Sequence, residues 1–80
     1  MDRDDVKQRV YGVIASVLKM DEGRIEESHS FTADLGAESV QSVELMAGFE
    51  EEFEIEMDED DALAVQTVGG AIDFIGKHLD

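Results

Sequence analysis

Residues 34–45, DLGAESVQSVEL, place a serine just after a glycine turn, an arrangement that can support covalent chemistry. Gly36 suits a tight turn because it tolerates backbone angles that other residues avoid. Ser39 follows at the expected start of a helix, where unpaired amide N–H groups carry a partial positive charge and favour an attached phosphate. A serine at a helix start can also simply cap that helix through its hydroxyl. The local sequence leaves both interpretations open.

The elements around this serine are predicted to be helical. Apolar residues at helical spacing predict a helix over residues 2–18 and a second over residues 39–53. An N-cap at Asp58 predicts a short third helix that buries Leu63 and Val65, and a cap at Thr67 predicts a fourth helix. We therefore expect an all-α fold, a small four-helix bundle with three longer helices and one short third helix, forming a single domain over residues 1–80.

The sequence also predicts how the first two helices are connected and which face of the second helix points to the core. Residues 19–38 form a loop of about twenty residues, which is long for a compact domain, and its obvious anchors are Ile25, Phe31 and Leu35. Plotted at helical spacing, one side of the second helix gathers Val43, Leu45, Met46, Phe49 and Phe53. The opposite side gathers Val40, Glu44, Ala47, Gly48 and Glu51. The first side is expected to face the core.

The charge of the chain restricts its partners. It has 21 Asp and Glu residues against 6 Lys and Arg, a formal net charge of −15 at pH 7. Such a surface repels nucleic acids and anionic lipids and attracts basic protein patches, and salt or divalent cations should make the fold firmer. The chain has no cysteine, so it offers neither a thiol nucleophile nor a Cys-based metal site. No signal sequence or membrane span is evident, and we expect a cytoplasmic monomer.

The stretch SFTADLGAESVQSVELMAGFEEEFEIEM resembles the core of the acyl carrier proteins, and the likeness extends to TVGGAIDFI near the end of the chain. The resemblance implies that Ser39 is joined by a phosphodiester to 4′-phosphopantetheine, delivered by a phosphopantetheinyl transferase. The arm carries acyl groups as thioesters to fatty-acid, lipid or polyketide-type biosynthetic enzymes with basic patches. The protein is then a carrier and not an enzyme, and it needs no metal.

The resemblance also implies a surface for enzymes and a space for the acyl chain. The positions that match the family's partner contacts are Glu38, Val40, Glu44, Ala47, Glu50 and Glu51. The candidates to line an acyl pocket between the helices are Phe31, Val43, Leu45, Met46, Phe49, Val65, Ala71, Ile72 and Ile75. Glu38, Val40 and Ala47 replace the family's usual Asp, Leu and Met, and Gly48 is costly in an exposed helix. These departures predict a specialised member of the family.

Other functions fit the sequence less well. A hydrolase would need Ser39 as nucleophile with His29 or His78 as base, but no strand or Gly-x-Ser-x-Gly elbow precedes the serine. The acidic run EEEFEIEMDED lacks the ligand order of a calcium loop. A peptidyl or aminoacyl carrier usually has Gly-Gly-His-Ser at the attachment point, where this chain has GAES. A non-catalytic acidic interaction module is the remaining alternative.

Overall fold

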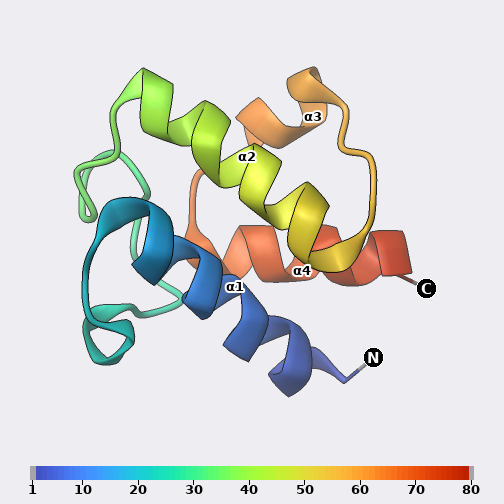
Figure 1. Ribbon diagram of the computed structural model, residues 1–80, viewed down its shortest axis with the longest axis horizontal. Helices are drawn as coiled ribbons and strands as arrows, with labels where there is room; N and C mark the ends of the chain where they lie inside the picture. The colour runs from blue at the N-terminus through green and yellow to red at the C-terminus, as the bar shows by residue number, and fades with distance from the viewer. Residues whose placement is uncertain (1, 80) are drawn as a thin grey trace.

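Four helices and one short 3-10 turn make up the computed structural model, which describes residues 2–79 (Figure 1). The helices are α1 (Arg3–Leu18), α2 (Ser39–Phe53), α3 (Glu59–Ala64) and α4 (Val68–Leu79), and the 3-10 turn η1 spans Glu22–Arg24. The predicted all-α fold with a short third helix is confirmed. Helices α1 and α2 run antiparallel, and α1 packs against both α2 and α4.

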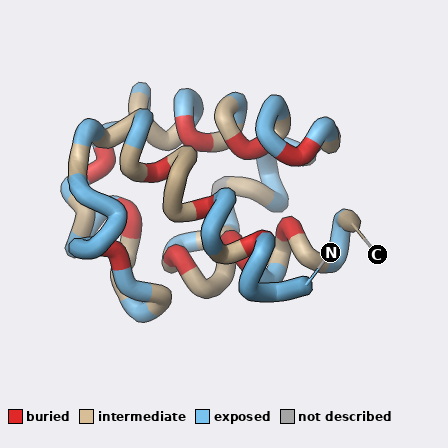
Figure 2. The backbone as a smooth tube through the Cα atoms, turned by 60° about the horizontal axis from the view of Figure 1, so that its bottom comes forward, coloured by how far each residue is buried: buried red, intermediate tan, exposed pale blue. Residues whose placement is uncertain are grey.

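The core is a single cluster of apolar side chains, to which the three longer helices and the first loop all contribute. The members on the helices are buried because they recur on a single face of each helix, so that packing removes one stripe of each helix from water. Figure 2 shows these buried stretches on the inward sides of the helices. The buried residues are Val6, Val10, Ile14, Ile25, Phe31, Ala37, Leu45, Phe49, Phe53, Val68, Ala71, Ile72 and Ile75.

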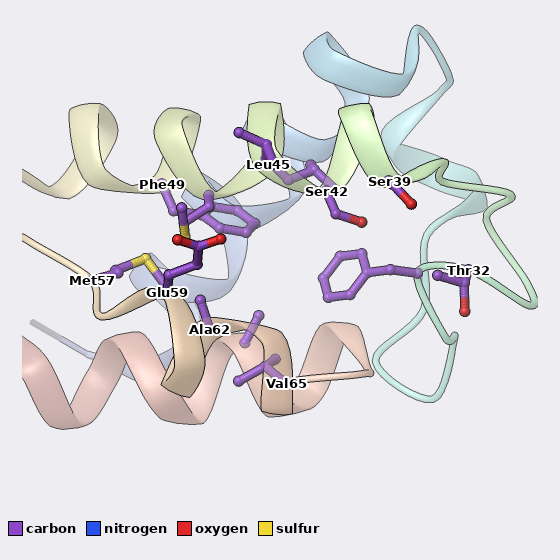
Figure 3. Close-up of a pocket in the computed structure, with 13 residues that line it drawn as sticks. Thr32, Ser39, Ser42, Leu45, Phe49, Met57, Glu59, Ala62 and Val65 are labelled. Carbon is purple, nitrogen blue, oxygen red and sulfur yellow. The ribbon is translucent and has the colours of Figure 1, made fainter.

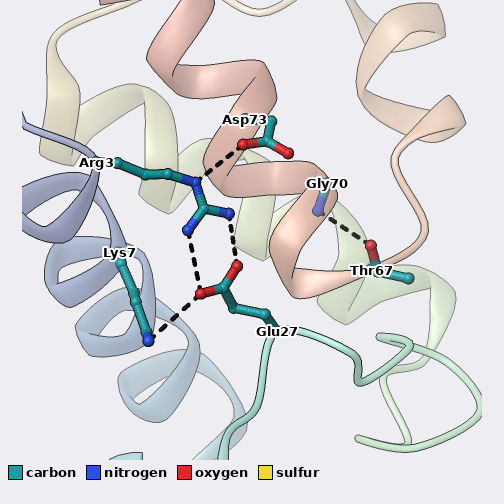
Figure 4. Close-up of polar contacts among 6 residues, drawn as sticks. All are labelled: Arg3, Lys7, Glu27, Thr67, Gly70 and Asp73. Carbon is teal, nitrogen blue, oxygen red and sulfur yellow. Dashed lines mark hydrogen bonds and ion pairs between the residues drawn. The ribbon is translucent and has the colours of Figure 1, made fainter.

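The two cap predictions agree with the structure. The Asp58 side chain accepts a hydrogen bond from the Asp60 N–H at 3.1 Å, and α3 begins at the next residue. The Thr67 hydroxyl accepts from the Gly70 N–H at 3.0 Å at the start of α4 (Figure 4). Val65 is half-buried against the core. The predicted burial of Leu63 concerns a side chain outside the described part of the structure.

The loop between α1 and α2 is tied to the start of α4 by backbone hydrogen bonds. The Phe31 N–H donates to the Gln66 carbonyl at 3.0 Å, and the Val68 N–H donates to the His29 carbonyl at 3.0 Å. The Gly69 N–H donates to the Glu27 carbonyl at 2.9 Å. These bonds satisfy backbone groups that a long loop would otherwise leave unpaired, and they fix the loop without a sheet.

Glu27 also links the loop to α1 through charged hydrogen bonds (Figure 4). The Arg3 guanidinium donates to both Glu27 carboxylate oxygens and, through Nε, to Asp73 at 3.1 Å, while Lys7 Nζ lies 3.4 Å from Glu27. The hydrogen bonds from Arg3, reinforced by Lys7, hold the pKa of the Glu27 carboxyl below its ordinary value despite some desolvation. One carboxylate therefore joins α1 to the loop, and Arg3 extends the link to α4.

Gly48 lies where α2 crosses α1, and not in an exposed helix as the sequence pattern indicated. A Cβ atom placed on Gly48 would lie 2.7 Å from Val13 Cγ1 of α1. Valine has one strongly preferred side-chain rotamer in a helix, so Val13 cannot easily turn away. Glycine at this position is therefore explained by the close approach of two helices, and the assignment of Gly48 to the side of the helix away from the core is wrong.

Replacing Gly48 with Ala should destabilise the protein by about 1–3 kcal/mol, because the added methyl group overpacks the crossing. Equilibrium urea unfolding measures this. The matched control is Gly12→Ala in α1, where no heavy atom lies within 4 Å of the added Cβ, and which should stabilise by about 0.5–1 kcal/mol. Adding Val13→Ala should remove most of the clash. A Gly48→Ala variant as stable as Gly12→Ala would contradict this explanation.

Glu27→Gln should reveal a pH-dependent contribution to stability. Because the carboxyl pKa is lowered on folding, the contribution is present above its unfolded value of about 4.5 and is lost as pH falls through the lower folded pKa. The Tm difference between wild type and Glu27→Gln should therefore stay constant from about pH 7 to pH 5 and shrink below about pH 4. Glu22→Gln, at an exposed carboxylate outside this network, is the control. A difference that widens in acid would refute the assignment.

Candidate functional site

Ser39 is the first residue of α2, and its side chain is exposed. The capping position belongs to Glu38, whose φ of −85° and ψ of 168° are extended, so the interpretation of Ser39 as the helix cap is wrong. The Gln41 side chain accepts a hydrogen bond from the Glu38 N–H at 2.9 Å, which stabilises the helix start. Capping therefore uses Glu38 and Gln41, and the Ser39 hydroxyl is left available for chemistry.

The turn before Ser39 is held in place by hydrogen bonds and by one buried residue, Ala37. Gly36 has φ of +70°, a left-handed conformation that strains residues with a side chain. Next to it, Ala37 is 6% exposed, and its N–H donates to the Phe31 carbonyl at 2.8 Å. The Asp34 carboxylate accepts from the Ser30 N–H at 2.7 Å. Leu35, one of the predicted anchors, is half-buried, whereas Ala37 is a buried anchor that the sequence pattern did not single out.

The backbone of the first turn of α2 suits a phosphate at Ser39. The first helical hydrogen bond runs from the Ser42 N–H to the Glu38 carbonyl at 2.9 Å, so the amides of residues 39–41 have no carbonyl partner within the helix. Together with the helix dipole they give this end a partial positive charge. The residues present therefore fit a phosphodiester at the Ser39 oxygen. When bound, 4′-phosphopantetheine supplies a terminal thiol, which this cysteine-free chain lacks.

A cavity of about 410 Å³ opens beside Ser39, between α2 and α3 (Figure 3). Its volume lies in the range of small-molecule sites. Ser39 itself borders the cavity. Seven of the nine predicted pocket residues line it, namely Phe31, Val43, Leu45, Met46, Phe49, Val65 and Ala71.

Ile72 and Ile75 lie outside this cavity. They are 1% and 0% exposed and belong to the core of the bundle, where α4 packs against α1. The regular apolar spacing of α4 does not separate residues that face α1 from a residue such as Ala71, which faces the cavity. This is why the sequence alone grouped the three together.

Val43 lies at the rim of the cavity and is 57% exposed, so its assignment to the core side of α2 is wrong. Val40, one turn earlier, is 67% exposed. Five further lining residues were not predicted: Thr32, Ser42, Met57, Glu59 and Ala62. Met57 precedes the predicted cap at Asp58 and Ala62 is an apolar residue of the short helix that follows, and these positions were the available signal for them. Nothing in the spacing marked Glu59 or Thr32.

The predicted partner positions are exposed to solvent, with one exception. Glu38, Val40, Glu44, Ala47 and Glu51 are exposed. Glu50 is half-buried, and its carboxylate accepts a hydrogen bond from the Met57 N–H at 3.0 Å, which stabilises the connection to α3. Every charged residue of the segment 38–61 is acidic. The site therefore sits in a strongly negative surface.

Neither histidine is placed as a catalytic base would be. His29 accepts a hydrogen bond from the Glu26 N–H through Nδ1 at 3.1 Å, and His78 stacks on Phe74 near the end of α4. Within residues 2–79 no three His, Cys, Asp or Glu side chains converge as metal ligands. No helix of the same residues is long and apolar enough to cross a membrane.

The fold and site define a class of protein, a small helical bundle that presents a serine at a helix start beside an apolar cavity. The model of the phosphopantetheine attachment site family matches residues 8–75. A curated acyl carrier protein from Phenylobacterium zucineum (strain HLK1) is 45% identical over 75 residues, covering 94% of this chain and 95% of that protein.

A solved structure, of the acyl carrier protein from Enterococcus faecalis, superposes with a TM-score of 0.79 at 29% identity, covering 98% of this chain and 99% of that one. The chain belongs to the acyl carrier protein family, whose members carry 4′-phosphopantetheine.

Proposed function

We propose that Ser39 is the attachment residue for 4′-phosphopantetheine and that this chain carries acyl groups for fatty-acid, lipid or polyketide-type biosynthetic enzymes. The observation that carries the proposal is the exposed Ser39 at the first position of α2, on the border of an apolar cavity. Attack of the Ser39 hydroxyl on coenzyme A would break the P–O–P bond of its pyrophosphate and form a phosphodiester at the Ser39 oxygen, with release of adenosine 3′,5′-bisphosphate and the hydroxyl proton. The chain then acts as a carrier and not as a catalyst.

The acidic surface of α2 is the proposed docking site for the transferase and the acyl-processing enzymes. Glu38, Glu44 and Glu51 offer exposed carboxylates at the start of α2 and along it, and Val40 and Ala47 offer small apolar contacts between them. A basic partner patch would be attracted over several ångströms, which favours fast encounter and fast release. Glu50 would contribute in part through its bond to the Met57 N–H, by holding the connection to α3 in place.

The small contacts at Val40 and Ala47 support a specialised set of partners, because they present less apolar area than Leu and Met would. The relevant comparison is kcat/KM of ordinary fatty-acid elongation enzymes for this carrier and for a standard one. Lower values for this carrier are expected, and equal values would contradict specialisation. We further propose a single-domain, cytoplasmic monomer, with the basic partners and their coenzyme A in the same compartment.

Intact mass tests the attachment directly. Incubation with coenzyme A, Mg²⁺ and a broad-specificity phosphopantetheinyl transferase should add one arm to the wild type and none to Ser39→Ala. Ser42→Ala is the matched control because Ser42 lies one turn further along α2 and also borders the cavity, and it should still gain the arm. Addition of an arm to Ser39→Ala would show that the attachment site is another residue. No gain in the wild type, even with the host's own transferase, would favour an acidic interaction module.

A further inference from the structure

The cavity beside Ser39 is apolar along its walls but has a carboxylate at its border. Glu59, the first residue of α3, lines it together with Met57 and Phe49. Figure 3 shows the Glu59 carboxylate pointing from α3 toward α2, at the opposite end of the cavity from Ser39 and Thr32. Ser42 lies between the two ends. An acyl chain that enters the cavity from an arm on Ser39 and extends along it would meet Glu59 at the far end.

The separation of the two ends suits an acyl chain. Ser39 and Phe49 are ten residues apart on α2, which at the helical rise corresponds to about 15 Å. Apart from Ser42, the side chains that face this interval are apolar, among them Leu45, Ala62 and Val65. Methylene groups would be buried along this stretch, and the last atoms of a long chain would reach the carboxylate.

The Glu59 carboxylate has no charged partner within the described part of the chain. The ion pairs of residues 2–79 use the carboxylates of Glu26, Glu27, Glu52 and Asp73. No Lys or Arg lies in the segment 38–64, which contains α2 and α3. The carboxylate is therefore hydrated, with its acceptor positions open to a ligand.

The chemical group at the far end of the acyl chain determines whether the water displaced from the Glu59 carboxylate is replaced by another hydrogen bond. A methyl end placed against the carboxylate displaces water and returns no hydrogen bond, which is unfavourable. A hydroxyl or ammonium end replaces the displaced water with a charge-assisted hydrogen bond, the stronger kind. The same cavity therefore distinguishes chains by what they carry at the end away from the thioester.

We propose that this cavity selects acyl chains that bear a hydrogen-bond donor, a hydroxyl or ammonium group, at the end remote from the thioester, and that Glu59 is the residue that recognises it. The proposal rests on the proposed attachment at Ser39, since the tether places the chain in the cavity. The proposal adds to that function a class of cargo, acyl chains with a polar far end, and a residue that selects it, Glu59.

The test compares cargoes on the same carrier. Wild type is loaded by the transferase with amide-linked octanoyl, decanoyl and dodecanoyl arms and with their ω-hydroxy and ω-amino counterparts, and intact mass confirms loading. For at least one length, the ω-hydroxy and ω-amino arms should raise Tm by about 4 °C or more above the plain arm, a shift that a single new hydrogen bond gives in a domain of this size. The amide signal of Glu59 should shift with the polar end in NMR spectra.

Two substitutions show whether Glu59 is responsible. Glu59→Leu should reverse the preference, so that the plain arm gives the higher Tm, and Glu59→Gln should lose the ω-amino advantage while keeping part of the ω-hydroxy one. Asp61→Asn removes a neighbouring charge of the same helical turn that does not line the cavity, and it should keep the wild-type order.

The outcomes separate the two proposals. Failure to load the wild type refutes attachment at Ser39 and the cargo proposal with it. Successful loading with a plain arm that stabilises as much as the polar arms at every length leaves attachment standing and overturns the role of Glu59. That role is also overturned if Asp61→Asn abolishes the preference as fully as Glu59→Leu does, because general charge would then explain it.

Discussion

The fixed path of residues 19–38 is the constraint on which the site depends. This segment has only one 3-10 turn of its own, so its position comes from buried side chains and from backbone bonds to the start of α4. Phe31 is central, because its side chain is buried, its N–H binds the Gln66 carbonyl, and its carbonyl binds the Ala37 N–H. Through these contacts the core sets where Gly36 turns and where Ser39 begins α2.

The distribution of charge follows from the same architecture. Arg3, Lys7 and Arg9 all lie on α1, and each pairs with a carboxylate of the loop, α2 or α4. These cations therefore serve to hold elements together. The acidic residues around Ser39 and along α3 have no basic residue near them in the sequence, and that excess of negative charge is the surface we propose for basic partners.

Helical spacing predicted much of this structure, because a helix that packs by one face leaves a periodic trace. The bounds of α2 and the caps at Asp58 and Thr67 agree with the sequence prediction for that reason. Contacts between distant segments leave no such trace. The bonds of the loop to α4 are made by backbone atoms of any residue type, and the Gly48 crossing depends on how closely α1 approaches. Glu59 likewise reaches the cavity only through the placement of α3.

We propose above all that a group on Ser39 and its cargo occupy the cavity between α2 and α3. Backbone amide NMR spectra of the unmodified, arm-loaded and acylated protein test it most directly. We expect loading to shift amides next to Ser39 and acylation to add shifts at cavity residues such as Met46, Ala62 and Val65. Acylation shifts that avoid these residues and fall instead on Ile72 and Ile75, in the core shared with α1, would contradict it.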